Sequence, residues 1–347
     1  FSGNCRITRL VFPETLSSIG EGAFRGCSGL MEISFPAASC VIGARAFEKC
    51  TRLSKVCLYA GYAGTGAFAY CLSLEKAEVR GISVLECRLF ECCENLRECI
   101  CEQGLVIRED CFCGCKNLKK FDFRLIEEIG SYAFLDCDGL REIALGEHAL
   151  LHPHAFEDCG CLERIVLLGS QEGPRLCEYA LSGCTALRQV VRQGQLWELH
   201  TYRDILSERL PKVVRLIFHS ALSCFEVERE ESLCGYRGFG CIIKIPEGIK
   251  RIEGEVFQDR LMLEQVHIPD SVEYIGPRAF HKTAWMEKQR EKSPMVEVNH
   301  MLLDGSSCTG EVVVPEDIRL VCGWAFAGGL GIERIRFLSD RVKVEAY

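Results

Sequence analysis

A five-residue stretch, Ala23-Phe24-Arg25-Gly26-Cys27, recurs along the chain and decides its fold. It returns as Ala46-Phe47-Glu48-Lys49-Cys50 and as Ala67-Phe68-Ala69-Tyr70-Cys71. The aromatic position advances by 23, 21, 22, 22, 22, 22 and 25 residues, ending at Leu181, and a cysteine always follows it three positions later. The cysteines of this column are Cys27, Cys50, Cys71, Cys93, Cys115, Cys137, Cys159 and Cys184. A fixed period of about 20–29 residues is typical of repeats that stack into a solenoid.

Each copy continues in the same way. A leucine lies three residues after the cysteine, as Leu30 does, and an apolar pair such as Ile33 and Phe35 follows. This alternation predicts a half-buried strand. A proline such as Pro36 often ends the strand, because proline has no N–H to continue a ladder. A second short apolar stretch, such as residues 16–20, precedes the next Ala-Phe turn, so one coil reads as strand, turn, short strand and tight turn.

Coils of this kind predict a leucine-rich-repeat fold. We expect a right-handed α/β solenoid, mostly β, with a parallel sheet on one face and short strands and helical turns on the other. A single coil cannot bury its apolar face, so stacking must create one continuous core. In particular, residues 118–123 should pair with residues 97–101 on one side and with residues 140–145 on the other.

The array changes character after Arg192. We interpret residues 1–192 as about eight coils, starting within a coil, because the period holds over that range. Residues 193–224 do not follow the period and are interpreted as an irregular, partly helical insertion, with a helix expected around residues 204–210. The repeat resumes over residues 225–347.

The C-terminal part carries two departures from the simple repeat. Phe257, Phe280 and Phe326 hold the aromatic position, but no cysteine follows them three residues later. The last interval between aromatic positions, from Phe280 to Phe326, is 46 residues, which is twice 23. Within it, Asp304-Gly305 separates alternating apolar stretches, which indicates a β-hairpin. Residues 225–246 resemble a second copy of that hairpin. We therefore expect further repeats with two inserted β-hairpins.

Composition narrows the classes of function. The chain has 347 residues, 48% of them hydrophobic, and a formal net charge of -8 with acids and bases interspersed. A basic footprint for nucleic acid is absent from this pattern, so no nucleic-acid partner is expected. No apolar run approaches the roughly 18 residues that a membrane span needs. The chain begins at Phe1 without the basic and apolar regions of a signal peptide.

The 24 cysteines allow two interpretations. The column cysteines could form disulfides or bind metal, or they could be small buried hydrophobes that fill the tight turn of each coil. We favour packing, because the isoleucine, leucine and phenylalanine columns share the same period and stacking requires identical columns. No cofactor is expected.

A denser group of cysteines lies between Cys87 and Cys115. Thiolates at close spacing can bind zinc. Packing explains most of them, however: Cys111 replaces the usual alanine of the turn, and Cys99 and Cys101 fill the inward strand pair. The segment has no C-x-x-C pair. Packing is the favoured interpretation, while metal binding and disulfides stay open as alternatives for this segment.

The histidines and the known catalytic motifs give no active site. His148 and His152 have the spacing of a metalloprotease pair, with His154 nearby, but Ala149 stands where the general-base glutamate is required. The sequence lacks the G-x-S-x-G, G-x-x-x-x-G-K and G-x-G-x-x-G motifs. We expect a protein without catalytic activity.

The repeat pattern resembles a known family. Ile19-Gly20-x-x-Ala23-Phe24-x-x-Cys27-x-x-Leu30-x-x-Ile33-x-Phe35-Pro36 is similar to the BspA-like leucine-rich repeat, and the resemblance covers nearly the whole chain except about 193–224. The resemblance implies a surface or secreted protein of host-associated bacteria or protozoa that takes part in adhesion. It carries no catalytic motif, so no active-site residue can be transferred. The unusual cysteine content is the main departure from the family pattern.

The outward positions of the strands suggest where a partner would bind, because side chains alternate along a strand. One outward column reads Glu32, Lys55, Lys76, Glu98, Lys120, Glu142, Arg164 and Gln189, which brings opposite charges together. The other outward column ends in Ala144, Val166 and Val191, three apolar residues on a face that we expect to be exposed to solvent. Such a patch often marks a contact site. We expect it to be either a partner-binding patch, with Glu142 and Arg164 beside it, or the seat of residues 193–224.

Three classes of function follow. The leading hypothesis is an extracellular or cell-surface binding protein that presents its solenoid to a protein or glycan partner. The alternative is an intracellular scaffold of the same fold, which the abundant cysteines favour because thiols persist in a reducing compartment. An enzyme built on residues 193–224 is a third, less favoured hypothesis.

Overall fold

The computed structural model describes residues 1–35, 40–101, 105–169, 173–206 and 209–345. The chain forms two compact units, Phe1–Leu199 with Glu208–Ser223, and His200–Ser207 with Cys224–Tyr347. The three-part division expected from the sequence, with limits at residues 192 and 224, stays a prediction.

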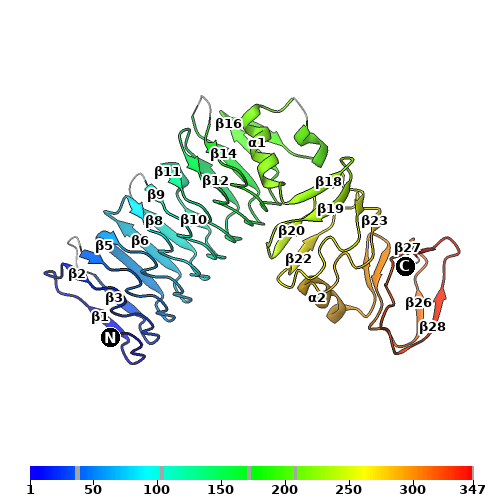
Figure 1. Ribbon diagram of the computed structural model, residues 1–347, viewed down its shortest axis with the longest axis horizontal. Helices are drawn as coiled ribbons and strands as arrows, with labels where there is room; N and C mark the ends of the chain where they lie inside the picture. The colour runs from blue at the N-terminus through cyan, green and yellow to red at the C-terminus, as the bar shows by residue number, and fades with distance from the viewer. Residues whose placement is uncertain (36–39, 102–104, 170–172, 207–208, 346–347) are drawn as a thin grey trace. The chain divides into compact units, whose positions relative to one another are not determined.

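The longer strands of the first unit pair in parallel on one face (Figure 1). Each coil contributes the strand that its apolar alternation predicts: in the strand Glu142–Leu145, Ile143 and Leu145 are buried, whereas Glu142 is exposed. These strands are β1 (Arg9–Val11), β3 (Glu32–Ser34), β5 (Lys55–Ala63), β6 (Lys76–Arg80), β8 (Glu98–Cys101), β10 (Lys120–Phe121), β12 (Glu142–Leu145), β14 (Arg164–Leu167) and β16 (Gln189–Arg192). The predicted parallel solenoid is confirmed.

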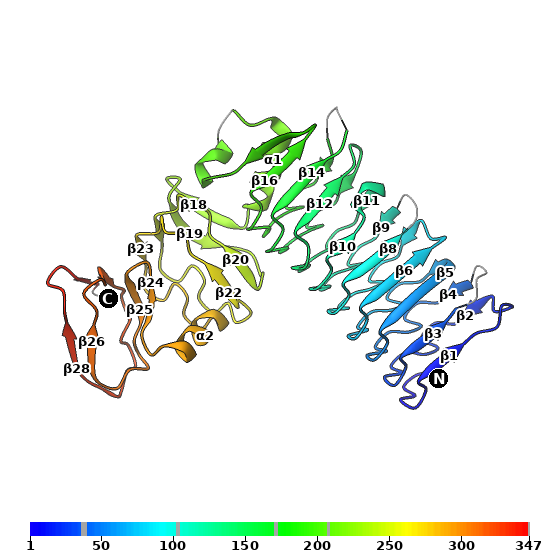
Figure 2. The same ribbon diagram turned by 180° about the vertical axis from the view of Figure 1, so that it is seen from behind.

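A second set of parallel strands follows the first in most coils. The strands are β2 (Ser18–Ile19), β4 (Cys40–Ile42), β7 (Val84–Leu85), β9 (Leu105–Ile107), β11 (Ile126–Ile129), β13 (Leu150–Leu151) and β15 (Arg175–Leu176). From β7 to β15 they form one uninterrupted five-stranded ladder. Seen from behind, these coils lie side by side (Figure 2).

The phenylalanine column forms the centre of the core. The rings of Phe24, Phe47, Phe68, Phe90, Phe112, Phe134 and Phe156 stack with centroids 5.0–5.9 Å apart. The backbone holds the same register, since the N–H of Phe134 donates to the carbonyl of Ala155 in the next coil at 2.8 Å. The repeated Ala-Phe turn is therefore both a packing unit and a hydrogen-bonding unit.

The cysteine column lies beside the rings and is fully buried. Each of its eight thiols donates a hydrogen bond, at 3.1–3.4 Å, to the carbonyl at the aromatic position of the preceding coil. None of the 24 cysteines is joined in a disulfide. The column cysteine thus fills space, as the sequence indicated, and also occupies the second lone pair of a buried carbonyl.

One expected strand pairing does not form. The strand β10 pairs with β8, as predicted, but no ladder joins β10 to β12 within the described residues. The cause is Asp122, whose carboxylate accepts a hydrogen bond from the N–H of Arg124 at 3.0 Å and caps the 3-10 helix η1 (Phe123–Leu125). The chain therefore leaves the strand conformation after Phe121, and the main ladder restarts at β12.

The segment after β16 begins with a tight hairpin. Gln193 and Gly194 both have left-handed φ angles, 52° and 75°, and return the chain as β17 (Gln195–Glu198), antiparallel to β16. The position predicted for the helix, residues 204–210, is wrong. A 3-10 helix, η2 (Tyr202–Leu206), precedes Pro211, and the α-helix α1 (Lys212–Ala221) follows Pro211. Helix α1 buries Val214, Ile217, Phe218 and Ala221, the spacing of an amphipathic helix.

The second unit repeats the two-strand coil. Its strands of the first set are β20 (Ile242–Lys244), β22 (Gln265–His267), β26 (Gly310–Val314) and β28 (Ile332–Phe337), and its short strands are β21 (Arg251–Ile252), β23 (Tyr274–Ile275), β27 (Leu320–Val321) and β29 (Lys343–Val344). Neighbours pair in parallel. Helix α2 (Ala284–Lys292) begins at Thr283, whose hydroxyl accepts a hydrogen bond from the N–H of Met286 at 3.1 Å.

Both expected hairpins are present, but their turns lie elsewhere. The first joins β18 (Phe225–Glu228) to β19 (Ser232–Tyr236), and the second joins β24 (Val296–Val298) to β25 (Met301–Asp304). Their turns are Arg229-Glu230 and Asn299-His300, all with left-handed φ angles, whereas Asp304-Gly305 is not a hairpin turn. The second strand of each hairpin then pairs in parallel with the next short strand.

Candidate functional site

The outward face of β12, β14, β16 and β17 is the candidate site that the sequence indicated. Burial of Ile143, Ile165 and Val190 fixes these strands against the core. Because side chains alternate, the residues on either side point outward, in register from strand to strand. Two parallel rows result, one polar and one apolar.

The polar row is a continuous chain of contacts. The guanidinium of Arg164 lies 3.5 Å from the carboxylate of Glu142, and its Nε donates to Gln189 at 2.8 Å. The amide of Gln189 in turn donates to Glu198 of β17 at 2.7 Å. An equivalent row begins on β6, where Glu98 contacts both Lys76 and Lys120, at 3.3 and 3.6 Å. The charges are thus already paired in the free protein.

The apolar row consists of Ala144, Val166 and Val191, aligned by the strand register. All three side chains are half-exposed. Strand β17 adds a fourth member, Leu196, which lies opposite Val191 and is 46% exposed. We call the two rows together the row surface: Glu142, Ala144, Arg164, Val166, Gln189, Val191, Leu196 and Glu198.

The segment after residue 192 begins by extending the sheet that carries the row surface. Strand β17 lies beside β16 in the sheet. Helix α1 packs at the turn side of the last coil, where Ser220 accepts a hydrogen bond from the N–H of Leu181 at 3.1 Å. That residues 193–224 are seated on the patch stays a prediction, and the hairpin at Gln193-Gly194 places β17 at the edge of the sheet. Sequence analysis missed Leu196 and Glu198, although the Gly194 turn signal was available.

A hollow adjoins the row surface where the ladder breaks. It measures about 550 Å³ and lies between β8, β10 and β12, with Glu142 and Ala144 on one side and Ile100 on the other. Asp122 and Arg124 line it and form an ion pair at 2.7 Å. The hydrogen bond from Arg124 lowers the pKa of Asp122, so this carboxylate stays ionised. The repeat alone could not reveal this hollow.

The other candidate groups do not converge. His152 contacts Glu128 at 2.8 Å, whereas His154 lies between the rings of Tyr132 and Tyr179, with centroids 4.9 and 5.5 Å away. His148 is exposed. In the Cys87–Cys115 segment, the sulfurs of Cys99 and Cys101 are 3.9 Å apart. Over the part of the chain that the structure describes, no group of three or more His, Cys, Asp or Glu side chains is placed to hold a metal ion.

Comparison with known families decides the classification. The sequence matches the BspA type leucine-rich repeat region over residues 1–119, 105–202 and 241–347. The chain belongs to the BspA-type leucine-rich-repeat family. This confirms the resemblance drawn from the Ala-Phe-x-x-Cys repeat. A comparison with curated protein sequences found no match.

Several solved bacterial structures are similar in fold to this BspA-type chain. A leucine-rich repeat protein from Bacteroides ovatus is 20% identical, with a TM-score of 0.44, over 99% of this chain and 76% of that one. A leucine rich cell surface protein from Faecalibacterium prausnitzii is 16% identical, with a TM-score of 0.30, over 96% and 80%. The pneumococcal vaccine antigen PcpA is 12% identical, with a TM-score of 0.32, over 97% and 81%. Among the described residues, none of the helices has the length and apolar character required to cross a bilayer.

Proposed function

We propose that this BspA-type chain is a non-catalytic, adhesin-like binding protein that presents the row surface to a protein or glycan partner outside the cell or at the cell surface. The observation that carries the proposal is the outward apolar row, half-buried at Ala144, Val166 and Val191 and exposed at Leu196, beside a polar row whose charges are already paired. An apolar centre with a satisfied polar rim is the arrangement that binding interfaces use.

The rows favour a protein partner over a glycan. Burying the apolar row contributes roughly 25 cal/mol per Å² of apolar area removed from water. The chain Glu142–Arg164–Gln189–Glu198 needs no new partner, so a complex does not leave a buried charge unpaired. The rigid ladder fixes the spacing of the rows, which keeps the entropy cost of binding low.

The proposal is tested with one substitution in the row and one outside it. The purified chain is immobilised and screened against extracellular-matrix proteins and a glycan array, and each ligand is measured again with Val166→Glu and Val41→Glu. Val41 is 48% exposed on β4, away from the row surface, and is the matched control. We expect Val166→Glu to weaken binding at least tenfold, Val41→Glu to have no effect, and both variants to keep the wild-type melting temperature. Equal binding by Val166→Glu and the wild type contradicts the proposal.

The alternative function is an intracellular scaffold with the same surface. The absence of disulfides among the 24 cysteines favours it, because thiols persist in a reducing compartment. Protease treatment of intact cells separates the two locations: release of peptides from this chain supports the cell surface, and full protection supports the intracellular scaffold.

A further inference from the structure

The coil between Phe280 and Phe326 keeps the register of the repeat but lacks its ring. The N–H of Gly305 donates to the carbonyl of Ala325 at 2.6 Å, as the N–H of Phe257 donates to that of Ala279 at 2.8 Å. Cys308 follows Gly305 by three positions, the spacing of the cysteine column. Gly305 therefore occupies the aromatic position, and Asp304 stands where other coils have a small apolar residue. This divides the 46-residue interval into 25 and 21 residues.

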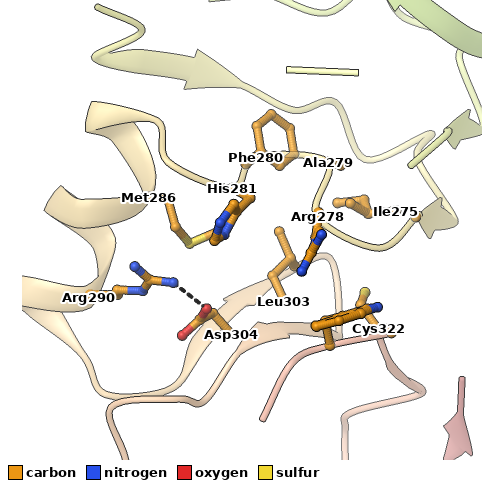
Figure 3. Close-up of a pocket in the computed structure, with 13 residues that line it drawn as sticks. Ile275, Arg278, Ala279, Phe280, His281, Met286, Arg290, Leu303, Asp304 and Cys322 are labelled. Atoms are coloured by element: carbon orange, nitrogen blue, oxygen red, sulfur yellow. Dashed lines mark hydrogen bonds and ion pairs between the residues drawn. The ribbon is translucent and has the colours of Figure 1, made fainter. Parts of the chain in front are cut away.

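A cavity lies beside this altered coil (Figure 3). Its volume is about 40 Å³, which is room for about three water molecules. Phe280, Met286 and Leu303 provide apolar lining. Gly305 itself leaves no open space, because a Cβ added there would lie 2.5 Å from the ring of Phe326.

The carboxylate of Asp304 already accepts three hydrogen bonds from the protein. One of its carboxylate oxygens accepts from Arg290 at 2.6 Å, and the other accepts from the N–H and the hydroxyl of Ser306, at 3.1 and 2.9 Å. Figure 3 shows the Arg290–Asp304 pair at one side of the cavity. The carboxylate of Asp304 is therefore engaged by the protein's own donors, and it holds Arg290 in the wall of the cavity.

Donors are in excess around the same space. The guanidinium of Arg278 lies 3.9 Å from the ring centroid of Trp324, a contact that holds it in place without using its N–H groups. Arg278 is exposed and His281 is half-buried, whereas the buried Nε of Arg290 has no hydrogen-bond acceptor among the described residues. Two guanidinium groups and one imidazole thus line a cavity whose one carboxylate already accepts three hydrogen bonds.

We infer that this cavity is a binding site for the carboxylate of a small organic acid. The planar fork of a guanidinium matches the two oxygens of a carboxylate. The apolar lining suits a short aliphatic tail, and the volume restricts the ligand to a few heavy atoms. The same carboxylate chemistry could come from a free acid or from the end of a polypeptide chain.

Propionate is the probe for the free acid, and propionamide is its neutral control. Binding is followed by tryptophan fluorescence, since Trp324 lines the cavity, and by saturation-transfer NMR on the full chain. A ligand of this size binds with a dissociation constant on the order of 1–10 mM. We expect propionamide to bind at least tenfold more weakly. A second arm compares a Gly-Gly-Ala peptide that has a free carboxylate with its amide; charge-dependent binding of the peptide but not of propionate supports the site and assigns its source as a chain end.

Arg278→Gln tests the residue assignment, and Arg251→Gln is its matched control. Arg251 lies 3.9 Å from the ring centroid of Tyr274, so its substitution removes the same kind of ring contact away from the cavity. We expect Arg278→Gln to weaken propionate binding at least fivefold and Arg251→Gln to leave it unchanged. The inference is overturned if neither probe shows saturable binding up to 100 mM, if acid and amide bind alike, or if the two variants behave alike.

Discussion

The thiol of Cys137 lies 3.2 Å from the carbonyl oxygen of Phe112, one coil earlier, and donates a hydrogen bond to it. Removing the thiol leaves the carbonyl with one partner fewer and leaves a small void. We expect Cys137→Ala to lower the free energy of unfolding by about 1–2 kcal/mol. Cys5→Ala is the control, because Cys5 is exposed. Urea unfolding measures both, and equal stability of the two variants would contradict this role for the thiol.

The column thiols should be unreactive in the folded protein. Burial raises the pKa of Cys71, Cys115, Cys137 and Cys159 well above the ordinary thiol value, so the nucleophilic thiolate is scarce. We expect an alkylating reagent at neutral pH to label Cys5 first and the column last. Unfolding without reductant should then expose all 24 thiols. Mass spectrometry of the labelled peptides checks both steps, and a count well below 24 would show disulfides.

The phenylalanine stack should respond strongly to truncation. Phe134 is fully buried between Phe112 and Phe156, with centroids 5.1 and 5.0 Å away. We expect Phe134→Ala to cost about 3–5 kcal/mol, because the neighbouring coils cannot close the void. Phe239→Ala, at a side chain that is 75% exposed, should cost little. Similar melting temperatures for the two variants would refute the importance of the stack.

Glycines set how closely the coils approach. A Cβ added at Gly130 would lie 2.7 Å from the backbone N of Glu109, whereas one added at Gly20, the same position of an earlier coil, would meet nothing within 4 Å. We therefore expect Gly130→Ala to destabilise the protein by about 1–3 kcal/mol through overpacking, and Gly20→Ala to be neutral. Thermal unfolding of the pair tests this, and a neutral Gly130→Ala would mean that the backbone shifts without cost.

Asp138 should make stability depend on pH. Burial, and then the nearby charge of Asp136, raises its pKa to about 6, while the N–H of Gly160, Lys116 and Arg141 oppose the shift. Below about pH 4 the carboxyl is protonated in the folded and unfolded states alike, so stability falls as pH rises from 4 through 6. Asp138→Asn should then stabilise the protein by about 1–3 kcal/mol at pH 7.5 and not at pH 4.

Asp122→Asn is the control of opposite sign for this experiment. Arg124 lowers the pKa of Asp122, so its ionised form favours the folded state, and the substitution should lower stability at pH 7.5. Thermal unfolding at the two pH values compares both variants. Equal effects of Asp138→Asn at pH 4 and pH 7.5 would contradict the assignment.

The sequence predicted what repetition determines and missed what single residues determine. Period and alternation were enough for the coils, the buried cysteine column and the outward row at Val166. The break after Phe121 depends on one cap, Asp122, which no repeat pattern encodes. The turns at Arg229-Glu230 and Asn299-His300 contain no glycine, so no common turn signal marks them. The hairpin turn was therefore predicted at Asp304-Gly305 instead. The repeat pattern could not mark Gly305 as a coil position, because the aromatic residue that identifies this position is absent there.

The break between β10 and β12 gives the first unit two unlike sides. The coils that contain β10 and β12 share no ladder between these two strands within the described residues. The ladder of short strands from β9 through β11 to β13 crosses the same junction unbroken. In mechanical terms, the short-strand side resists extension while the main-strand side is compliant. Under a stretching load this junction should therefore open as a hinge, widening the hollow beside Ala144 before any hydrogen-bonded ladder is lost.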